Sequence, residues 1–254
     1  MVETKVFEAG HYRYVRGPFQ YSGGVAAQPG YAIERVRFSQ RPKMVEGFLA
    51  IEAYLTARGH PFTSFCACEL RSPAPFTEKG FIDFNRVYVG TLERWGIFKN
   101  DENPVARSNV CLEIGGPSEP SFEAFSYTVP AENVAPARVT PSFVIAGSGE
   151  APEGPGGYDE RIIRLGDTSN SAMREKALYV LGAMETRMRA LGVGWTDATT
   201  TQVYTIRDLY PFLADEIVDR GASPVGLTWY YARPPVEGLE YEMDVRGIPS
   251  EITI

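Results

Sequence analysis

Apolar residues in the first part of the chain recur with the period-two spacing of β-strands. Residues 19–27 and 31–38 alternate in this way, and a Gln-Pro-Gly turn lies between them, so the pattern predicts a β-hairpin. Gly23 and Gly24 interrupt the first strand, which is typical of a bulge or of a close approach by another backbone or a ligand. Residues 1–16 fit an edge strand or an extended arm.

Two amphipathic helices with a buried strand between them are predicted next. Apolar side chains follow helical spacing over residues 44–58, where Gly59 ends the helix, and again within residues 76–95. The intervening residues 62–70 are small or apolar at nearly every position. Such a composition is typical of a strand that is buried on both faces.

The segment 104–129 carries the first candidate chemistry. Two apolar runs, residues 108–114 and 122–129, flank a loop that opens with Gly-Gly-Pro, which predicts a second hairpin. Arg107 and Glu123 stand near the starts of these strands, so a sheet can bring them to one cleft. Arginine can hold a carboxylate by two hydrogen bonds and glutamate can transfer protons. The alternative is a surface ion pair at the strand ends.

The order of elements then recurs, which indicates an internal duplication. A first unit covers residues 1–135 and a second covers residues 136–254, with a linker at 131–140. The two units differ chemically, because Arg107 falls opposite Leu227. The second unit keeps Glu240 opposite Glu123, and Arg164 or Arg233 is the alternative source of an arginine there. Matching elements are predicted at residues 142–150, 158–165, 172–191, 199–206 and 210–219.

Composition and charge narrow the class of protein. The 254 residues are 44% hydrophobic and 22% charged, which is ordinary for a soluble globular protein. No apolar run is long enough for a membrane span, and no secretory signal is apparent, so we expect a cytoplasmic protein. The net charge of −7, without a basic cluster, argues against a nucleic-acid partner.

The cysteines and histidines give no sign of a metal site. Cys66 and Cys68 lie at period two within one strand, and Cys111 is distant in sequence. His11 and His60 are the two histidines, and neither belongs to a Cys/His cluster. We therefore expect reduced, packed thiols and no metal site.

The motif PVARSNVCLEI…FEAFSYTV resembles the C-terminal hairpin of the reactive-intermediate deaminase (Rid, YjgF-like) family. That family reads P-A-R-S-x-V-x-V, then a turn, then a strand with an early glutamate. The resemblance covers nearly the whole chain as two tandem units, of which the second is degenerate. It implies an α+β fold, chorismate-mutase-like, in which each unit is a mixed β-sheet backed by two helices. It further implies assembly into a trimeric barrel, hence a homotrimer or larger homo-oligomer.

The resemblance also implies a function and roles for particular residues. Rid enzymes hydrolyse enamines and imines to keto acids and ammonia without a cofactor. By resemblance Arg107 binds the substrate carboxylate, and Glu123 orients or activates water. The other implied substrate contacts are Gly23 or Gly24, Tyr12 or Tyr14, and Asn109, which stands where the family typically has Cys or Thr.

Among two-unit relatives, the chain is similar to the 2-aminomuconate deaminases of aromatic-ring degradation. An amino-dicarboxylate substrate needs a second cation, for which Arg13, Arg16 and Arg41 are candidates unless they are solvated surface charges. The first interpretation is therefore a hydrolytic deaminase of an enamine or imine carboxylate. The alternatives are a non-catalytic ligand-binding protein of the same fold and a chorismate-type ring hydrolase or lyase.

Overall fold

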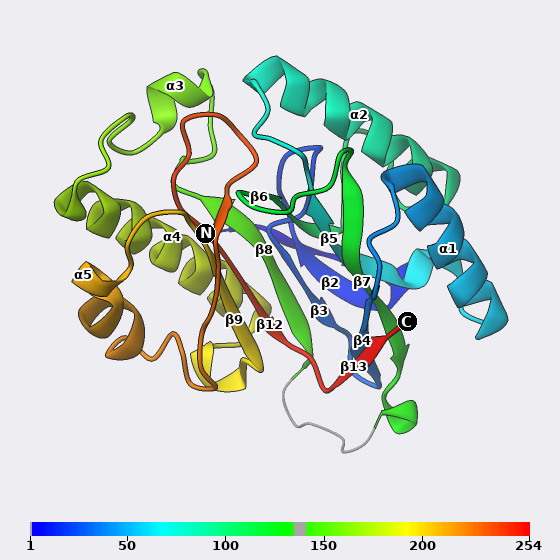
Figure 1. The fold of residues 1–254 in the computed structure, drawn as a ribbon. Coiled ribbons are helices and arrows are strands. Elements are labelled where there is room, and N and C mark those ends of the chain that lie inside the picture. The colour runs from blue at the N-terminus through cyan, green and yellow to red at the C-terminus, as the bar shows by residue number, and fades with distance from the viewer. Residues whose placement is uncertain (1, 135–140) are drawn as a thin grey trace.

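The computed structural model describes residues 2–134 and 141–254, which form two mixed β-sheets with helices on their outer faces (Figure 1). In the seven-stranded sheet all neighbours are antiparallel except β9 and β10. Its strands, in spatial order, are β1 (Thr4–Phe7), β2 (Tyr12–Val15), β3 (Gly24–Ala27), β8 (Phe143–Gly149), β12 (Glu242–Gly247), β9 (Thr200–Tyr204) and β10 (Thr228–Tyr230).

The six-stranded sheet contains two parallel pairs, β5 with β6 and β4 with β13. Its other neighbours are antiparallel. The strands, in spatial order, are β11 (Ala232–Arg233), β6 (Ala106–Leu112), β5 (Phe65–Arg71), β7 (Ser121–Pro130), β4 (Tyr31–Arg37) and β13 (Ser250–Thr253).

Helices cover the outer face of each sheet, and each covered face buries its own apolar core. The two longest helices on the six-stranded sheet are α1 (Met44–Ala57) and α2 (Glu78–Arg94). The seven-stranded sheet carries α4 (Asn170–Leu191) and the short α5 (Tyr210–Phe212), which continues as a π-helical segment, Leu213–Val218. The remaining helical segments are α3 (Tyr158–Arg161) and single 3-10 turns at Glu8–Gly10, Phe62–Ser64, Ala131–Asn133 and Trp195–Asp197.

The helix boundaries follow from local sequence. The side chains of Thr77 and Ser169 accept hydrogen bonds from the backbone N–H groups of Gly80 and Ala172, so each caps the helix that it precedes. Gly192, with φ of 77°, ends α4 in the left-handed conformation that glycine adopts without strain. The helices predicted at residues 44–58, 76–95 and 172–191 are confirmed.

The predicted fold class, two tandem Rid-like units assembling into a trimeric barrel, is wrong. The two sheets exchange strands: β3 from the start of the chain pairs with β8, and β13 from its end pairs with β4. A third core lies between the facing sheets, so the sheets of one chain already pack against each other. The physical reason is that an exposed strand edge needs a partner, and here each half of the chain supplies one to the other.

Both predicted hairpins and one strand are also wrong. β3 and β4 lie in different sheets, and β5 lies between β6 and β7. Residues 158–165 form α3 and a turn, because the apolar residues Tyr158, Ile162 and Leu165 also match helical spacing. Most of the predicted linker, residues 135–140, lies outside the described residues.

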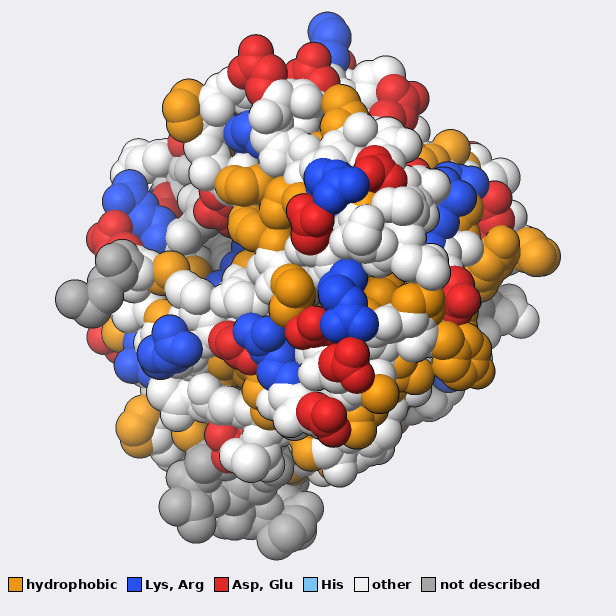
Figure 2. All heavy atoms as spheres, turned by 90° about the vertical axis from the view of Figure 1, so that its left-hand side faces the viewer, with side chains coloured by type: hydrophobic (Ala, Val, Ile, Leu, Met, Phe, Trp, Pro, Cys, Tyr) orange, Lys and Arg blue, Asp and Glu red, His pale blue; other side chains and the backbone are white. Residues whose placement is uncertain are grey.

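The two sheets come together where β6 passes beside β8. The hypothetical β-carbon of Gly147 on β8 would lie 3.3 Å from Cα of Ser108 on β6. An isolated parallel bridge joins Ser22, just before β3, to Ala106 on β6 and links the two sheets further. On the face that carries α4 and α5, anionic and cationic side chains are interspersed (Figure 2). None of the described helices has the length and apolar character needed to cross a membrane.

Candidate active site

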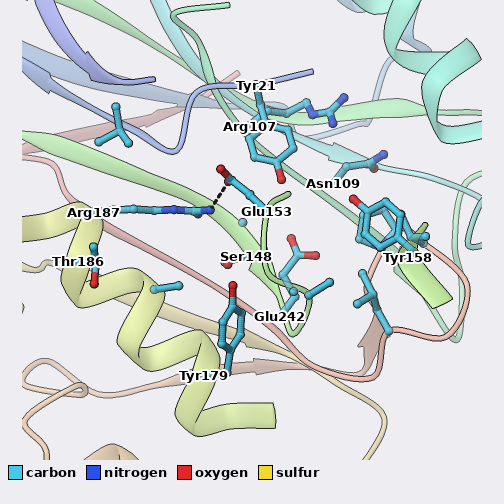
Figure 3. Close-up of a pocket in the computed structure, with 18 of the residues that line it drawn as sticks. Tyr21, Arg107, Asn109, Ser148, Glu153, Tyr158, Tyr179, Thr186, Arg187 and Glu242 are labelled. Atoms are coloured by element: carbon cyan, nitrogen blue, oxygen red, sulfur yellow. Dashed lines mark hydrogen bonds and ion pairs between the residues drawn. The ribbon is translucent and has the colours of Figure 1, made fainter. Parts of the chain in front are cut away.

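A cavity of about 570 Å³ lies where β6 meets β8 and β12, between α2 and α4 (Figure 3). Both halves of the chain contribute to its walls. Its polar lining comes from Arg107 and Asn109 on β6, Ser148 on β8, Glu242 on β12, Thr186 and Arg187 on α4, and Glu153 together with Tyr21, Tyr158 and Tyr179.

The β6 wall presents two donor groups that lack protein partners. Arg107 and Asn109 are two residues apart and therefore lie on the same face of the strand. Arg107 donates from Nη1 to Oδ1 of Asn85, and its buried Nε has no partner in the described protein. Oδ1 of Asn109 accepts from the Ser72 hydroxyl at 3.0 Å, while its buried Nδ2 is likewise unpartnered. Such orphaned buried donors need an acceptor from outside the chain.

Aromatic rings fix the Arg107 guanidinium and shield it from water. Its central carbon lies 5.1 to 5.7 Å from the ring centroids of Tyr21, Phe81, Phe84 and Tyr88. The side chain is nearly fully buried, and no acidic side chain of the described chain forms an ion pair with it. A buried, unpaired guanidinium is costly without a counter-ion, so the arrangement favours a bound anion.

The opposite wall, formed by β12, presents a buried carboxyl. Glu242 is 3% exposed, and its carboxyl has no hydrogen bond to the residues that the structure describes. Burial, and next the neighbouring Asp244, raise the pKa of Glu242 well above its usual range, although Arg107 and Arg71 oppose this. Burial therefore favours the protonated form of Glu242, and such a carboxyl can both donate and accept a proton.

Gly147 makes room for this carboxyl. A β-carbon at Gly147 would lie 2.1 Å from Oε1 of Glu242. The backbone before Glu242 is held as well, because the Glu150 carboxylate accepts from the N–H groups of Glu240 and Tyr241 at 2.6 and 3.0 Å. Lys176, fully buried, pairs with Glu150 at 3.1 Å. Both contacts fix where Glu242 enters the cavity.

The α4 wall contributes a second arginine. Arg187 donates from Nη1 to the Ala146 carbonyl at 3.3 Å and from Nη2 to Glu153 at 3.1 Å. Two tyrosine hydroxyls lie near this pair. Burial raises the pKa values of Tyr21 and Tyr179, and the charges of Arg187 and Glu153 act on both in opposite directions. These hydroxyls are therefore neutral donors at physiological pH.

The structure does not bring Glu123 to Arg107. Glu123 lines a different cavity of about 330 Å³ and pairs with Arg37 at 3.1 Å and with Arg41. The predicted meeting of Arg107 and Glu123 fails because β5 separates their strands. Burial opposes ionisation of Glu123, but Arg71 and Arg41 outweigh it and lower the pKa of this carboxyl.

The other residues singled out by resemblance lie outside the cavity lining, apart from Asn109. Gly23 and Gly24 already use their N–H groups, which donate to the Val15 carbonyl and to the Ser22 hydroxyl. The hydroxyls of Tyr12 and Tyr14 donate to the Phe65 carbonyl at 3.3 Å and to Glu102 at 2.6 Å. Gly23 nevertheless contacts the site indirectly, because its β-carbon would lie 3.1 Å from Nε of Arg187.

Of the candidates for a second cation, Arg16 alone lines the cavity, and it pairs with Glu3 at 3.0 Å. The other two candidates are engaged elsewhere, because Arg13 donates to the Leu191 carbonyl and Arg41 binds Glu123. The arginines considered as the alternative fork of the second unit are paired as well: Arg164 binds Asp167 and Glu175, and Arg233 binds Glu113.

Sequence reasoning missed Glu242 and Arg187, although the sequence contains a signal for the first. Acidic residues at 240, 242 and 244 alternate with apolar ones, which predicts an acidic face on a strand. The alignment of the two halves placed only Glu240 opposite Glu123, and in the structure Glu240 forms an ion pair with Arg207 at 2.9 Å. Gly147 and Gly149, also at period two, indicate a close approach to that strand.

Among the described residues, no group of three or more His, Cys, Asp or Glu side chains is placed to hold a metal ion. The three cysteines are free and buried. Burial raises the pKa of Cys68 to about 12, so this thiol is not a thiolate nucleophile at neutral pH.

Comparison with known proteins gives a family, one relative and one solved structure with partial similarity. A family described as 2-aminomuconate deaminase CnbZ matches residues 4–252. The 2-amino-5-chloromuconate deaminase of Comamonas testosteroni is 51% identical over 254 residues, which is 100% of both chains. A solved structure of a chorismatase is 14% identical, covers 97% of this chain and 85% of its own, and superposes with a TM-score of 0.46.

Proposed function

Since this chain belongs to the 2-aminomuconate deaminase CnbZ family, we propose that it hydrolyses a 2-aminomuconate-type enamine carboxylate to the corresponding 2-keto acid and ammonia. The observation that carries the proposal is the placement of the buried Glu242 carboxyl, whose protonated form is favoured by burial, in the same cavity as Arg107. One group can bind a carboxylate and the other can move protons.

The carboxylate next to the amino-bearing carbon binds at the β6 wall. Arg107 Nε and Asn109 Nδ2 are both buried donors without protein partners, and a carboxylate satisfies both. The aromatic surroundings of Arg107 exclude water and strengthen this charge-assisted contact. Binding there fixes the enamine relative to Glu242.

Glu242 acts first as an acid. Its proton passes to the conjugated carbon chain of the substrate while the nitrogen lone pair forms a C=N bond, which gives a protonated imine and the Glu242 carboxylate. The raised pKa of Glu242 favours the protonated form that this step requires. Asp244 and burial then favour return of a proton to Glu242.

Glu242 next acts as a base. Its carboxylate accepts a proton from a water molecule whose oxygen adds to the imine carbon. The hydroxyl proton of the resulting carbinolamine passes to nitrogen, the C–N bond breaks, and the C=O bond forms. One water is consumed, one ammonia is released, and Glu242 ends protonated, so the cycle is balanced.

The test is ammonia release from freshly generated 2-aminomuconate by the purified protein, with Glu242→Gln and Glu123→Gln compared in parallel. We expect Glu242→Gln to lower kcat by roughly a hundred- to ten-thousandfold, the usual contribution of a general acid or base. Glu123→Gln keeps most of the rate. The proposed role is wrong if Glu242→Gln, folded as wild type, releases ammonia at the wild-type rate. Binding of 2-keto acids without turnover would instead indicate a ligand-binding protein.

A further inference from the structure

We propose that Arg187 determines specificity by binding the second, distal carboxylate of a dicarboxylate substrate, and that Glu153 occupies this position until the substrate displaces it. The proposal rests on the proposed function, because it assigns a substrate class to the same cavity. Two features carry it, the fixed position of Arg187 and the exposed position of its partner.

Arg187 is a buried cation that the fold holds in place. Its side chain is 10% exposed, and one arm is fixed by the Ala146 carbonyl of β8. The stem lies against Gly23, where any β-carbon would come within 3.1 Å of Nε. The guanidinium therefore projects from α4 into the cavity in one direction (Figure 3).

Its anionic partner is neither buried nor part of a regular element. The Glu153 side chain is 52% exposed and belongs to the Gly- and Pro-rich segment between β8 and α3. Arg161 holds this segment on either side of Glu153, donating to the carbonyls of Pro152 at 2.6 Å and Gly156 at 3.1 Å. The Glu153 carboxylate thus reaches into the cavity from a loop whose ends stay anchored.

A substrate carboxylate is a better partner for Arg187 than Glu153. An ion pair with a half-exposed partner contributes little, because water competes for the carboxylate. A carboxylate enclosed in the cavity would be shielded from water and held at its other end by the substrate's own attachment. Displacement of Glu153 then costs little, since its carboxylate moves into solvent.

The two arginines are near enough to serve one molecule. The central guanidinium carbon of Arg107 lies 5.7 Å from the centroid of the Tyr21 ring. Tyr21 and both arginines line one cavity. A six-carbon diacid can therefore place one carboxylate at Arg107 and the other at Arg187, within the cavity that Glu242 also lines.

The experiment uses two matched inhibitors, muconate (2,4-hexadienedioate) and sorbate (2,4-hexadienoate), which differ in the second carboxylate. Inhibition constants are measured against ammonia release, and dissociation constants by calorimetry. We expect wild type to prefer muconate. Arg187→Gln should weaken muconate binding about tenfold or more and leave sorbate within about twofold. Arg189→Gln, an exposed arginine on the same helix, should change neither.

Glu153→Gln tests the second part of the proposal. Removing the resident charge should tighten muconate binding and lower KM several-fold, with a smaller effect on sorbate binding. Glu237→Gln, an exposed glutamate near the rim, is the matched control. Arg187→Lys keeps the charge without the fork and covers the case in which Arg187→Gln does not fold; it should retain part of the preference for muconate.

The outcomes separate this inference from the function that it rests on. Equal losses of muconate and sorbate binding in Arg187→Gln and Arg187→Lys would overturn the assignment of Arg187. Weaker muconate binding in Glu153→Gln would overturn the role of Glu153. Failure of wild type to release ammonia from any 2-aminodienoate would overturn the proposed function, while the calorimetric preference for the diacid would still decide the role of Arg187.

Discussion

A β-carbon on Gly147 would lie 2.1 Å from Oε1 of Glu242, so the carboxyl in the cavity occupies space that only a glycine leaves free. Gly147→Ala should therefore turn Glu242 away while the sheet stays intact. We expect kcat to fall about a hundredfold, the usual effect of misplacing a reacting group by an ångström or so. Steady-state ammonia release measures it. Gly90→Ala, in α2 with nothing within 4 Å, is the control and should be fully active.

Glu242 also makes stability depend on pH. Burial raises its pKa, so between the ordinary glutamate pKa and the raised value the folded state holds a proton that the unfolded state has lost. The contribution of Glu242 to the free energy of unfolding is therefore largest at low pH, and it falls by about 1.4 kcal/mol per pH unit within that window. Glu242→Gln removes this loss of stability at higher pH, because glutamine does not ionise. Its thermal midpoint should exceed that of wild type by an amount that grows with pH, and a pH-independent difference would contradict this.

Arg107→Lys tests the geometry of the first carboxylate site. Lysine keeps the positive charge but loses the contact with Asn85 and the planar stacking among the aromatic rings. We expect KM to rise at least tenfold, with a smaller change in kcat. The comparison is with Arg86→Lys, an exposed arginine on α2. Equal KM values for Arg107→Lys and wild type would remove Arg107 from substrate binding.

Glu123→Gln should affect stability more than catalysis. Glu123 is buried, but its partners Arg37 and Arg41 are 50% and 35% exposed, so we expect a loss of about 1 kcal/mol or less at neutral pH. The pKa of Glu123 is lowered, so its contribution is present above the ordinary glutamate pKa and disappears as the pH falls. Wild type and variant should converge in chemical denaturation at acidic pH. A large loss of kcat would restore the catalytic role that resemblance implies for Glu123.

The exchange of strands predicts how fragments behave. Residues 1–135 lack β8 and β13, which pair with β3 and β4 in the full chain. We expect this fragment to be insoluble or unfolded on its own, and we expect the same of the fragment 136–254. Refolding the two fragments together should recover activity. Circular dichroism and ammonia release measure both effects. A stable, cooperatively unfolding 1–135 fragment would show that the first half is an independent domain.

What could be predicted from the sequence was local. The helices α1, α2 and α4 were predicted because helical spacing lies within each segment, and because a glycine follows α1 and α4. The pairing of the strands could not be predicted in this way, since β3 pairs with β8, which lies more than a hundred residues later in the chain. The motif that predicted one hairpin accordingly forms β6 and β7, and β5 lies between these two strands in the sheet.

The candidate site divides in the same way. Arg107 and Asn109 lie in the cavity as their motif suggested, because both are on one strand. Glu242 and Arg187 could not be placed from sequence, since Glu242 lies on a sheet that forms from both halves and Arg187 lies on α4, which packs on that sheet. A carboxylate near the start of a strand was expected opposite Arg107; Glu242 supplies one from β12 rather than β7.

The position of β12 has a consequence for synthesis. This strand lies between β8 and β9, yet it is the penultimate strand to leave the ribosome. Until it emerges, β8 and β9 each expose an unpaired edge, and nascent chains in that state are prone to associate with one another. Premature termination even a few codons before residue 242 would leave β8 and β9 with unpaired edges and would remove Glu242. The fold thus makes completion of translation a condition for solubility as well as for activity.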